Sequence, residues 1–363
     1  MKKNKNYVDL KDQPVPEGQH LLEVDDLKMY FHTEDGVVRA VDGVSYTLDR
    51  GETLGVVGES GSGKSVTAMT IMGLISMPPG KIEGGDVRYR GRSILEMTEE
   101  EMQHIRGNDI AMIFQDPMTS LNPVYKIGKQ VGEGLRLHRG YSKQEALKRA
   151  TELLDLVGIP EPEKRVNEYP HQFSGGMRQR VMIAMALACD PDIPIADEPT
   201  TALDVTIQAQ IIELMQEMQE KNGNAIIMIT HDLGVVADMA DKIMVMYAGR
   251  PVEFGTAEEI FYESRHPYTW GLIRSIPEQA IEEKKPLTPI HGNPPSLMNL
   301  PEGCVFSPRC PYATDKCRKQ RPERVVTESG HYSACHYSGD PEFLKNAPET
   351  SRTRKDSKKG GEA

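Results

Sequence analysis

Residues 58–65 read Gly-Glu-Ser-Gly-Ser-Gly-Lys-Ser, with the G-x-x-x-x-G-K-[ST] spacing of a P-loop, a segment whose backbone N–H groups wrap phosphate. The short apolar run 55–57 before it predicts a buried strand, and the residues after it predict a helix over 66–74. A P-loop requires this strand–loop–helix context, because the helix N-terminus adds a favourable dipole for the anion. The stretch therefore predicts an α/β fold with a phosphate site at the strand–helix turn.

Polar side chains suited to phosphate and magnesium chemistry occur at two places in the chain. Lys64 would bring a point charge to the β- and γ-phosphates, and Ser65 would place its hydroxyl on Mg²⁺. A mostly apolar run ends in Asp197, which suits a contact to the Mg²⁺ shell, and Glu198, which suits a base for the attacking water. Pro194 in this run puts the local strand pairing in doubt, because proline cannot donate to a ladder.

A second glycine-rich segment, Ser174-Gly175-Gly176, precedes a helix predicted from apolar residues at helical spacing over 177–188. Ser174 is then an N-cap, and a capped helix start with two glycines is a further anion site. An ordinary capped helix is the alternative. Another apolar run predicts a buried strand that delivers His231 at its end, where a histidine is more often structural than catalytic.

The order of these segments along the chain carries more information than any one of them. The P-loop is followed by Gln115, then Ser174-Gly175-Gly176, then Asp197-Glu198, and then His231. In this order the chain resembles an ATP-binding-cassette (ABC) ATPase, whose fold is an α/β P-loop core with a helical subdomain and an antiparallel β subdomain. The resemblance implies that the chain uses ATP and Mg²⁺.

The resemblance also implies roles for residues whose chemistry alone is ambiguous. Gln115 would sense Mg²⁺ and the attacking water, and His231 would face the γ-phosphate. Residues 174–176 correspond to the signature motif, which contacts the γ-phosphate bound by the opposite subunit. Phe173 and Met177 replace the commoner Leu and Gln of that motif, while its Ser-Gly-Gly core is kept.

The contacts around the nucleotide follow from the same resemblance. The implied ATP-binding residues are Phe31, Ser60, Gly61, Gly63, Lys64, Ser65, Thr67, Gln115, Asp197, Ser174, Gly175 and Gly176. The implied Mg²⁺ residues are Ser65, Gln115 and Asp197, and the implied catalytic residues are Glu198, His231 and Gln115. Phe31, or alternatively Tyr30, precedes the P-loop by the distance at which the family stacks an aromatic ring on adenine; an aromatic at a strand edge is the alternative. Residues 202–204 resemble the loop that crosses the subunit interface.

Charge and hydropathy limit the class of protein. The chain of 363 residues carries a formal charge of −11, and its acids and bases are interspersed, so no long basic stripe argues for nucleic-acid binding. The longest uncharged apolar run, near 181–189, is far shorter than the roughly 20 residues that span a bilayer. The N-terminus has charge but no apolar segment after it, so it is no secretory signal. We expect a cytosolic protein.

Composition divides the chain into segments. The predicted divisions are a polar leader (1–20), a nucleotide-binding domain (21–265) with a helical subdomain at about 117–180, a Pro-rich irregular extension (266–340) and a disordered tail (349–363). Within the helical subdomain, Ser142 and Glu145 form a capping-box pattern before apolar residues at helical spacing. Because the ATP motifs all precede residue 265, we expect them to lie in a region separate from the extension.

The extension holds Cys304, Cys310, Cys317 and Cys335, spaced C-x₅-C-x₆-C-x₁₇-C. In a cytosolic protein such clustering favours metal over disulfides. Zinc sites usually show paired C-x₂₋₄-C ligands, which neither short spacing here provides, whereas four thiolates from irregular loops suit a 4Fe-4S cluster. Zinc and unliganded thiols are the alternatives. The remaining cysteine, Cys189, is interpreted as a small buried apolar residue.

Three motifs of this region narrow the family. Residues 266–269 (HPYT), 290–295 (IHGNPP) and 303–311 (GCVFSPRCP) together resemble the C-terminal extension of oligopeptide and dipeptide importer ATPase subunits. The resemblance covers about 21–340, and in that family the extension can hold a 4Fe-4S cluster on cysteines that correspond to these. It implies a motor at the cytoplasmic face of the membrane that pairs with a related ATPase, drives two permease subunits, and works with an extracytoplasmic peptide-binding protein.

Two other functions compete with a peptide-importer motor. One is a soluble cassette ATPase with an iron–sulfur site that acts on nucleic acid or ribosomes. Such proteins carry two cassettes or a long coiled-coil insertion, whereas this chain has one P-loop, no heptad run and an acidic balance. The other is a regulatory subunit without turnover, which the presence of Glu198 and His231 disfavours.

Overall fold

The computed structural model describes residues 10–200, 205–276 and 289–348. Its strands are β1 (Leu22–Thr33), β2 (Gly36–Leu48), β3 (Thr53–Val57), β4 (Gly80–Tyr89), β5 (Arg92–Ser93), β6 (Ile110–Ile113), β7 (Ile193–Asp197), β8 (Ile226–Thr230), β9 (Lys242–Tyr247), β10 (Arg250–Thr256), β11 (Val325–Val326) and β12 (Tyr332–Ser333). A smaller antiparallel sheet has the order β2-β1-β4-β5, and a larger sheet has the order β11-β12-β10-β9-β3-β8-β7-β6.

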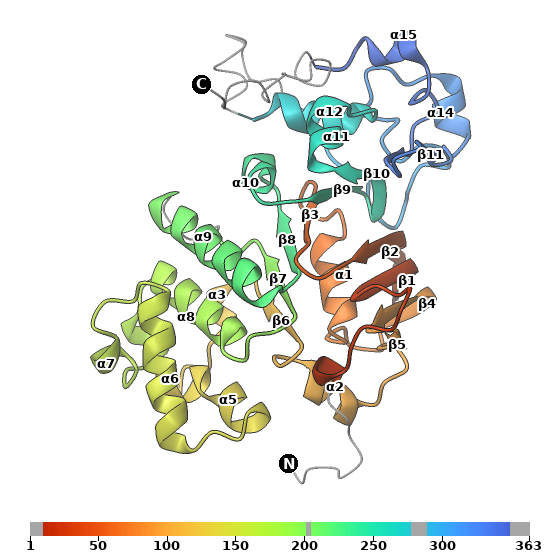
Figure 1. Ribbon diagram of the computed structural model, residues 1–363. Helices are drawn as coiled ribbons and strands as arrows, with labels where there is room; N and C mark the ends of the chain where they lie inside the picture. The colour runs from red at the N-terminus through yellow and green to blue at the C-terminus, as the bar shows by residue number, and fades with distance from the viewer. Residues whose placement is uncertain (1–9, 201–204, 277–288, 349–363) are drawn as a thin grey trace.

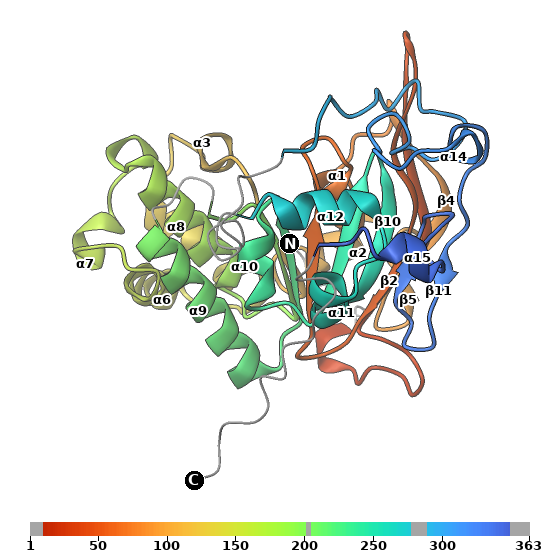
Figure 2. The same cartoon turned by 90° about the horizontal axis from the view of Figure 1, so that it is seen from above.

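Helices lie on both sides of the larger sheet. They are α1 (Lys64–Ile71), α2 (Glu99–Ile105), α3 (Pro117–Ser120), α4 (Ile127–Val131), α5 (Glu133–His138), α6 (Lys143–Leu156), α7 (Pro162–Arg165), α8 (Gly175–Leu187), α9 (Val205–Asn222), α10 (Leu233–Ala237), α11 (Ala257–Tyr262), α12 (Pro267–Arg274), α14 (Asp315–Lys319) and α15 (Pro341–Leu344), with 3₁₀ turns η1 (Leu10–Asp12) and η2 (Pro170–Gln172). Figures 1 and 2 show α6 to α9 on one side of strands β6 to β8, with the smaller sheet on the other.

Five parallel strands are consecutive in the larger sheet, in the order β9, β3, β8, β7 and β6, with β6 at the edge, and β3, β7 and β8 are buried at every residue. Such strands have near-continuous apolar sequences because both faces are covered. In β8, Ile227 and Ile229 belong to the apolar cluster that contains the buried face of α1. Ile226 and Met228 belong to the cluster that contains α6 and α8. The sheet therefore separates α1 from the helical subdomain.

Pro194 does not prevent strand pairing in β7. It lies opposite Ala111 of β6, and pairing with β8 begins one residue later, at Ile195. Successive residues of a parallel strand point their N–H groups toward opposite neighbours, and Ile193 donates to Asp109 before β6 at 3.0 Å. The N–H that proline lacks would therefore point toward β8 at a position where that ladder has not yet begun. The sequence put the pairing of this strand in doubt, but Pro194 lies where its missing N–H costs no hydrogen bond of the ladder.

The helical segment follows the sequence pattern and extends beyond it. Helices α3 to α7 lie within the predicted 117–180, while α8 continues to Leu187. The capping box at the start of α6 is confirmed, since the Ser142 hydroxyl accepts from the Glu145 N–H at 3.3 Å and the Glu145 carboxylate accepts from the Ser142 N–H at 2.8 Å. The predicted tail, 349–363, lies outside the described residues.

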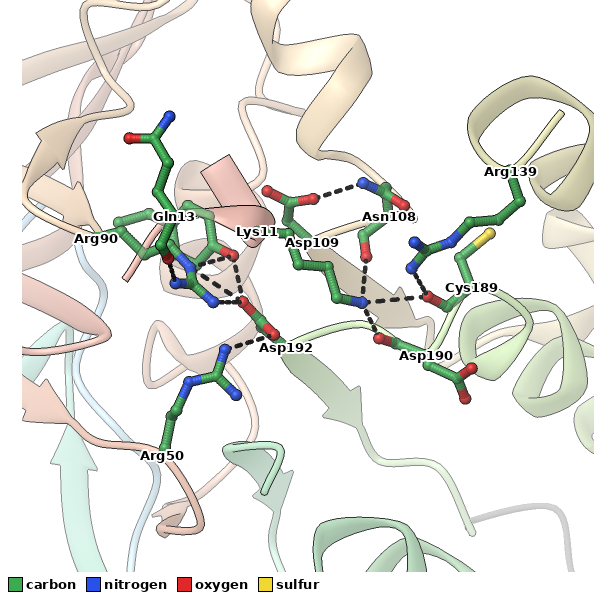
Figure 3. Close-up of polar contacts among 11 residues, drawn as sticks. Lys11, Gln13, Arg50, Arg90, Asn108, Asp109, Arg139, Cys189, Asp190 and Asp192 are labelled. Atoms are coloured by element: carbon green, nitrogen blue, oxygen red, sulfur yellow. Dashed lines mark hydrogen bonds and ion pairs between the residues drawn. The ribbon is translucent and has the colours of Figure 1, made fainter. Parts of the chain in front are cut away.

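The described part of the predicted polar leader, 1–20, is packed onto the cassette. Leu10 is 1 % exposed and belongs to the cluster beneath the smaller sheet. The ammonium of Lys11 donates to the backbone oxygens of Asn108 at 3.4 Å and of Cys189 at 3.3 Å, as Figure 3 shows. Burial is the main cause that lowers the pKa of Lys11. One buried leucine and one long side chain dock this segment, which its polar composition did not predict.

A buried ionic network next to Lys11 joins the two sheets. Asp192, immediately before β7, accepts from the hydroxyl of Tyr89 in β4 at 2.6 Å and from Arg90 at 2.5 Å (Figure 3). Arg50 reaches the second oxygen of Asp192 at 3.1 Å. Because Asp192 and Arg90 are almost fully buried, loss of either partner would leave an uncompensated charge.

The extension is built on the cassette. Strand β12 pairs with β10, placing Tyr332 opposite Phe254, so β11 and β12 prolong the larger sheet (Figure 1). The Phe306 ring lies 5.2 Å from that of Tyr247 in β9. The expectation that the extension lies apart from the ATP motifs is wrong, because Arg309 of the extension forms an ion pair with Glu59 of the P-loop.

Candidate active site

The P-loop joins the end of β3 to the start of α1 and requires glycine at two closely packed positions. Gly58 has φ +152°, and a Cβ there would lie 2.2 Å from the backbone oxygen of Met246. Gly63 has φ +100°, and a Cβ there would lie 2.3 Å from the oxygen of Ala40. Thr67 stabilises the turn, since its N–H and its hydroxyl both donate to the Gly63 oxygen at 2.9 Å. The loop is thereby clamped between β2 and β9.

Lys64 lies across the loop with only 5 % of its surface exposed. Its ammonium donates to the backbone oxygens of Gly58 at 2.6 Å and Glu59 at 3.1 Å. Burial lowers the Lys64 pKa, and the nearby carboxylates oppose this shift. Ser60 and Gly61 are exposed at the tip of the loop. This is a charged group held in a low-dielectric site beside open backbone, the arrangement that binds phosphate.

Asp197 ends β7 with 4 % of its surface exposed. The Ser65 hydroxyl, from the first turn of α1, donates to its Oδ1 at 3.0 Å. Burial raises the Asp197 pKa, and the neighbouring charge of Glu198 adds to that increase. A hydroxyl and a carboxylate oxygen on adjacent elements are hard ligands of the kind that Mg²⁺ prefers. A divalent cation would relieve the cost of burying this charge.

Glu198 brings together residues from three neighbouring strands. Its backbone lies in the left-handed region, with φ +47°, and its N–H donates to the Ile229 oxygen at 2.9 Å. One carboxylate oxygen accepts from the Gln115 amide at 3.0 Å, and the other lies 3.2 Å from Nδ1 of His231. Residues that follow β6, β7 and β8 thus meet at the carboxyl edge of the parallel strands, where α/β proteins bind ligands. Gln115 contacts Glu198 rather than Ser65 or Asp197 in this arrangement.

The segment Ser174-Gly175-Gly176 lies at the start of α8, away from the P-loop of the same chain. The Ser174 hydroxyl accepts from the Met177 N–H at 3.3 Å, which confirms the predicted N-cap. Ser174 and Gly175 are exposed, and a Cβ at Gly175 would meet no atom within 4 Å. Figures 1 and 2 place α8 and α1 on opposite sides of β7 and β8. This helix start therefore presents open N–H groups outward.

The chain matches two protein-family models. Residues 41–201 match "ABC transporter", and residues 252–317 match "Oligopeptide/dipeptide transporter, C-terminal region". The oligopeptide transport ATP-binding protein OppD of Bacillus subtilis is 58% identical over 312 residues, covering 86% of this chain and 87% of that protein. The chain belongs to the ATP-binding subunits of oligopeptide and dipeptide ABC transporters. The dipeptide transport ATP-binding protein DppD of Escherichia coli is 52% identical over 320 residues, covering 88% of this chain and 97% of that one.

Solved structures agree with this ABC ATPase fold. A dimeric ATP-binding cassette in a post-hydrolysis state, with ADP and Pi bound, matches with a TM-score of 0.60 and 29% identity, covering 65% of this chain and 98% of that one. The α/β fold predicted from sequence is confirmed. Across the described ranges, no helix has the length and apolar content to cross a membrane.

The adenine contact expected of this ABC ATPase stays a prediction. Tyr30 and Phe31 are both half-buried in β1. The Tyr30 hydroxyl donates to Asp42 at 3.0 Å, and Asp42 also accepts from Arg250 at 2.8 Å. This hydrogen bond engages the hydroxyl of Tyr30, so Phe31 remains the candidate for the ring that stacks on adenine. Residues 202–204, the expected interface loop, lie outside the described residues.

The cysteines of the ABC ATPase extension gather around one small cavity. Cys304, Cys310, Cys317 and Cys335 all line it, and none forms a disulfide. Burial raises the pKa of Cys310 to about 11 and that of Cys335 to about 12. Among the residues that the structure describes, no group of three or more His, Cys, Asp or Glu side chains is arranged to hold a metal ion. The four cysteines therefore share one cavity but are not arranged as a metal site, and the 4Fe-4S cluster stays a prediction.

Two residues outside the P-loop of this ABC ATPase contact it and were not predicted from the sequence. Glu59 occupies a variable position of the motif, and its partners Tyr268 and Arg309 lie 209 and 250 positions away. No local pattern marks such contacts. The available signal was that Tyr268 and Arg309 both lie inside motifs of the extension (266–269 and 303–311), which were used only to name the family.

Proposed function

We propose that this chain is the ATP-hydrolysing motor subunit of an ABC importer for oligopeptides or dipeptides. One observation carries the proposal: Lys64, the Ser65–Asp197 pair and Glu198 meet at the carboxyl edge of the parallel strands. The relatives named as peptide transport proteins support the substrate class. They give no support to an ATPase acting on nucleic acid or ribosomes.

The site residues divide the chemistry among them. The phosphate cradle is formed or supported by residues of the P-loop and the first turn of α1: Ser60, Gly61, Gly63, Lys64, Ser65 and Thr67. Phe31 lies against adenine. Ser65, Gln115 and Asp197 would hold Mg²⁺, and the ion would supply positive charge to the phosphates. Glu198 accepts a proton from the attacking water, and His231 faces the γ-phosphate. Gln115 orients that water beside the Glu198 carboxylate, to which its amide is bonded.

Each complete site is composed of two subunits. Ser174, Gly175 and Gly176 contact the γ-phosphate bound by a partner. This is supported by the exposure of Ser174 and Gly175 and by the position of α8, which lies across β7 and β8 from α1. The partner is a related ABC ATPase subunit. The pair drives two membrane permease subunits from the cytoplasmic face, docking near Gln115, and an extracytoplasmic peptide-binding protein supplies the substrate. The chain is divided into a cassette (21–265, helical subdomain about 117–180) and an extension (266–340).

We further propose that Cys304, Cys310, Cys317 and Cys335 bind a 4Fe-4S cluster. The cavity that these cysteines share is lined also by the aromatic rings of Phe306, Tyr312 and Phe343. Zinc usually takes paired C-x₂₋₄-C ligands, and neither short spacing among these cysteines fits that rule. The cluster would fix the loops of the extension.

The composite site makes a direct demand on activity. The isolated chain should be a poor ATPase, because each site lacks the partner's signature segment. Adding the related ATPase and the permeases should raise turnover at least tenfold. Full activity in the dilute, isolated chain would refute the shared site.

A further inference from the structure

Glu59 of the P-loop is held at all three of its polar groups. Its N–H donates to the hydroxyl of Tyr268 in α12 at 2.8 Å. Its carboxylate accepts from both terminal nitrogens of Arg309, at 2.5 and 2.9 Å. Its backbone oxygen accepts from the Lys64 ammonium at 3.1 Å. Glu59, one of the two residues that bind Lys64, is therefore fixed by two side chains from beyond β10.

The guanidinium of Arg309 is itself rigidly held. Its side chain is 4 % exposed, and its Nε donates to the backbone oxygen of His291 at 2.9 Å. Its terminal nitrogens also reach the oxygen of Ile290 at 3.1 Å and the Tyr247 hydroxyl at 3.3 Å. Bidentate Arg–carboxylate pairs with one buried partner are stiff and directional, unlike pairs on the surface, which contribute little. The Glu59 carboxylate thus binds a guanidinium whose two terminal nitrogens are already held in place.

The backbone that carries Arg309 is anchored to the cassette core. The N–H groups of Arg309 and Cys310 both donate to the Phe306 oxygen at 3.0 Å. The Phe306 ring packs against Tyr247 and Tyr268, with centroid separations of 5.2 and 5.4 Å. The same aromatic cluster therefore sets the positions of both groups that bind Glu59.

We propose that Arg309 is a positioning residue for the ATP site. Through its ion pair with Glu59 it holds the P-loop, and with it Lys64, in the conformation that receives the β- and γ-phosphates. Without the guanidinium, Glu59 loses its partner and the loop must be ordered when nucleotide binds, which weakens binding. This inference rests on the ATPase function proposed above.

The test measures MgATP affinity of the full-length chain by titration calorimetry. Arg309→Ala should weaken binding about tenfold, equivalent to about 1.4 kcal/mol. Glu59→Ala should weaken it by a similar factor. The double variant should bind no more weakly than either single variant, because both remove the same pair. Arg318→Ala is the matched control, since Arg318 is an exposed arginine of the same extension, and it should bind as the unaltered chain does.

Two further readouts separate positioning from simple stabilisation. Arg309→Lys should give an intermediate affinity, because one ammonium cannot reproduce the planar fork that spans both carboxylate oxygens. Thermal unfolding is recorded for each variant. Unchanged MgATP affinity in Arg309→Ala, with or without a lower Tm, would overturn the proposal, and so would a hundredfold loss in the double variant. The two proposals fail in different ways. If the unaltered chain does not bind MgATP, the proposed ATPase function is wrong. If the unaltered chain binds MgATP and Arg309→Ala binds it equally well, only the role of Arg309 is wrong.

Discussion

Replacing Glu198 by glutamine isolates the step of water activation. The carboxylate lies 3.0 Å from the Gln115 amide and 3.2 Å from His231, and its side chain is 12 % exposed. Glutamine keeps the size and one acceptor oxygen but cannot take up a proton. General-base catalysis contributes about 10²–10⁴-fold, so the hydrolysis rate should fall by that factor, a barrier increase of about 3–5 kcal/mol.

The same substitution should leave the fold and nucleotide binding nearly intact. One of the two bonds at residue 198 can be retained by the glutamine oxygen, so the cost in stability should be about 1 kcal/mol. Lys64, Ser65 and Asp197 are unaltered, and MgATP affinity should stay within about threefold of the original. The variant complex should therefore bind ATP, close and stall.

The assay is phosphate release by the assembled transporter at saturating ATP, with Glu220→Gln as the matched control. Glu220 is an exposed residue of α9, and its variant should hydrolyse ATP at the original rate. Turnover of the Glu198→Gln complex within threefold of the original would remove Glu198 from the role of base. A large loss of MgATP affinity would instead show that the carboxylate acts in binding.

Three further predictions concern the P-loop, the cysteines, and His266, whose Nδ1 accepts from the Tyr268 N–H at 3.1 Å and so caps the start of α12. Gly63→Ala should weaken MgATP binding more than tenfold, because its Cβ would lie 2.3 Å from a backbone oxygen. Gly140→Ala is the control: Gly140 has φ +70° and open space around it, so this variant should lose only about 1 kcal/mol of stability. Calorimetry measures the MgATP affinity and the stability of both variants. Burial lowers the pKa of His266 to about 4, so the unfolded chain binds more protons below pH 6.5 and stability should fall by roughly 3 kcal/mol as pH drops from about 6.5 to 4; acid unfolding of His266→Asn should lack this loss. Anaerobically purified protein should be brown with about four iron per chain, and Cys310→Ser or Cys317→Ser should lose most of it, whereas a colourless protein with one zinc would contradict the cluster.

Features set by short stretches of sequence were predicted well. The P-loop lies between β3 and α1 because its glycines and flanking apolar runs act over a few residues. The N-cap at Ser174 and the capping box at Ser142 depend on residues three positions apart, and both are confirmed. The order of the motifs then sufficed to name the fold through the resemblance to ABC ATPases, and the parallel pairing of β7 with β8 brings Asp197 and His231 to one edge.

Features set by contacts between distant residues were not predicted. Leu10 is buried because it packs into the apolar cluster beneath the smaller sheet, although its neighbours in the sequence are polar. The extension is irregular in sequence, yet β12 finds an edge on β10. The Glu59–Arg309 pair joins segments 250 positions apart, and neither residue stands in a periodic pattern. The doubt about strand pairing at Pro194 was unnecessary, because the hydrogen bonds between β7 and β8 begin only at Ile195, and the sequence alone does not show where that pairing starts.

In the proposed function, ATP turnover at this site drives peptide movement across a membrane. The most direct measurement is uptake of a radiolabelled oligopeptide into proteoliposomes that contain the complete transporter, with its binding protein outside and MgATP at the face that bears this subunit. Uptake should require ATP, cease in the Lys64→Ala complex, and fall at least a hundredfold in the Glu198→Gln complex. Peptide uptake that continues at the original rate in both variants would contradict the account.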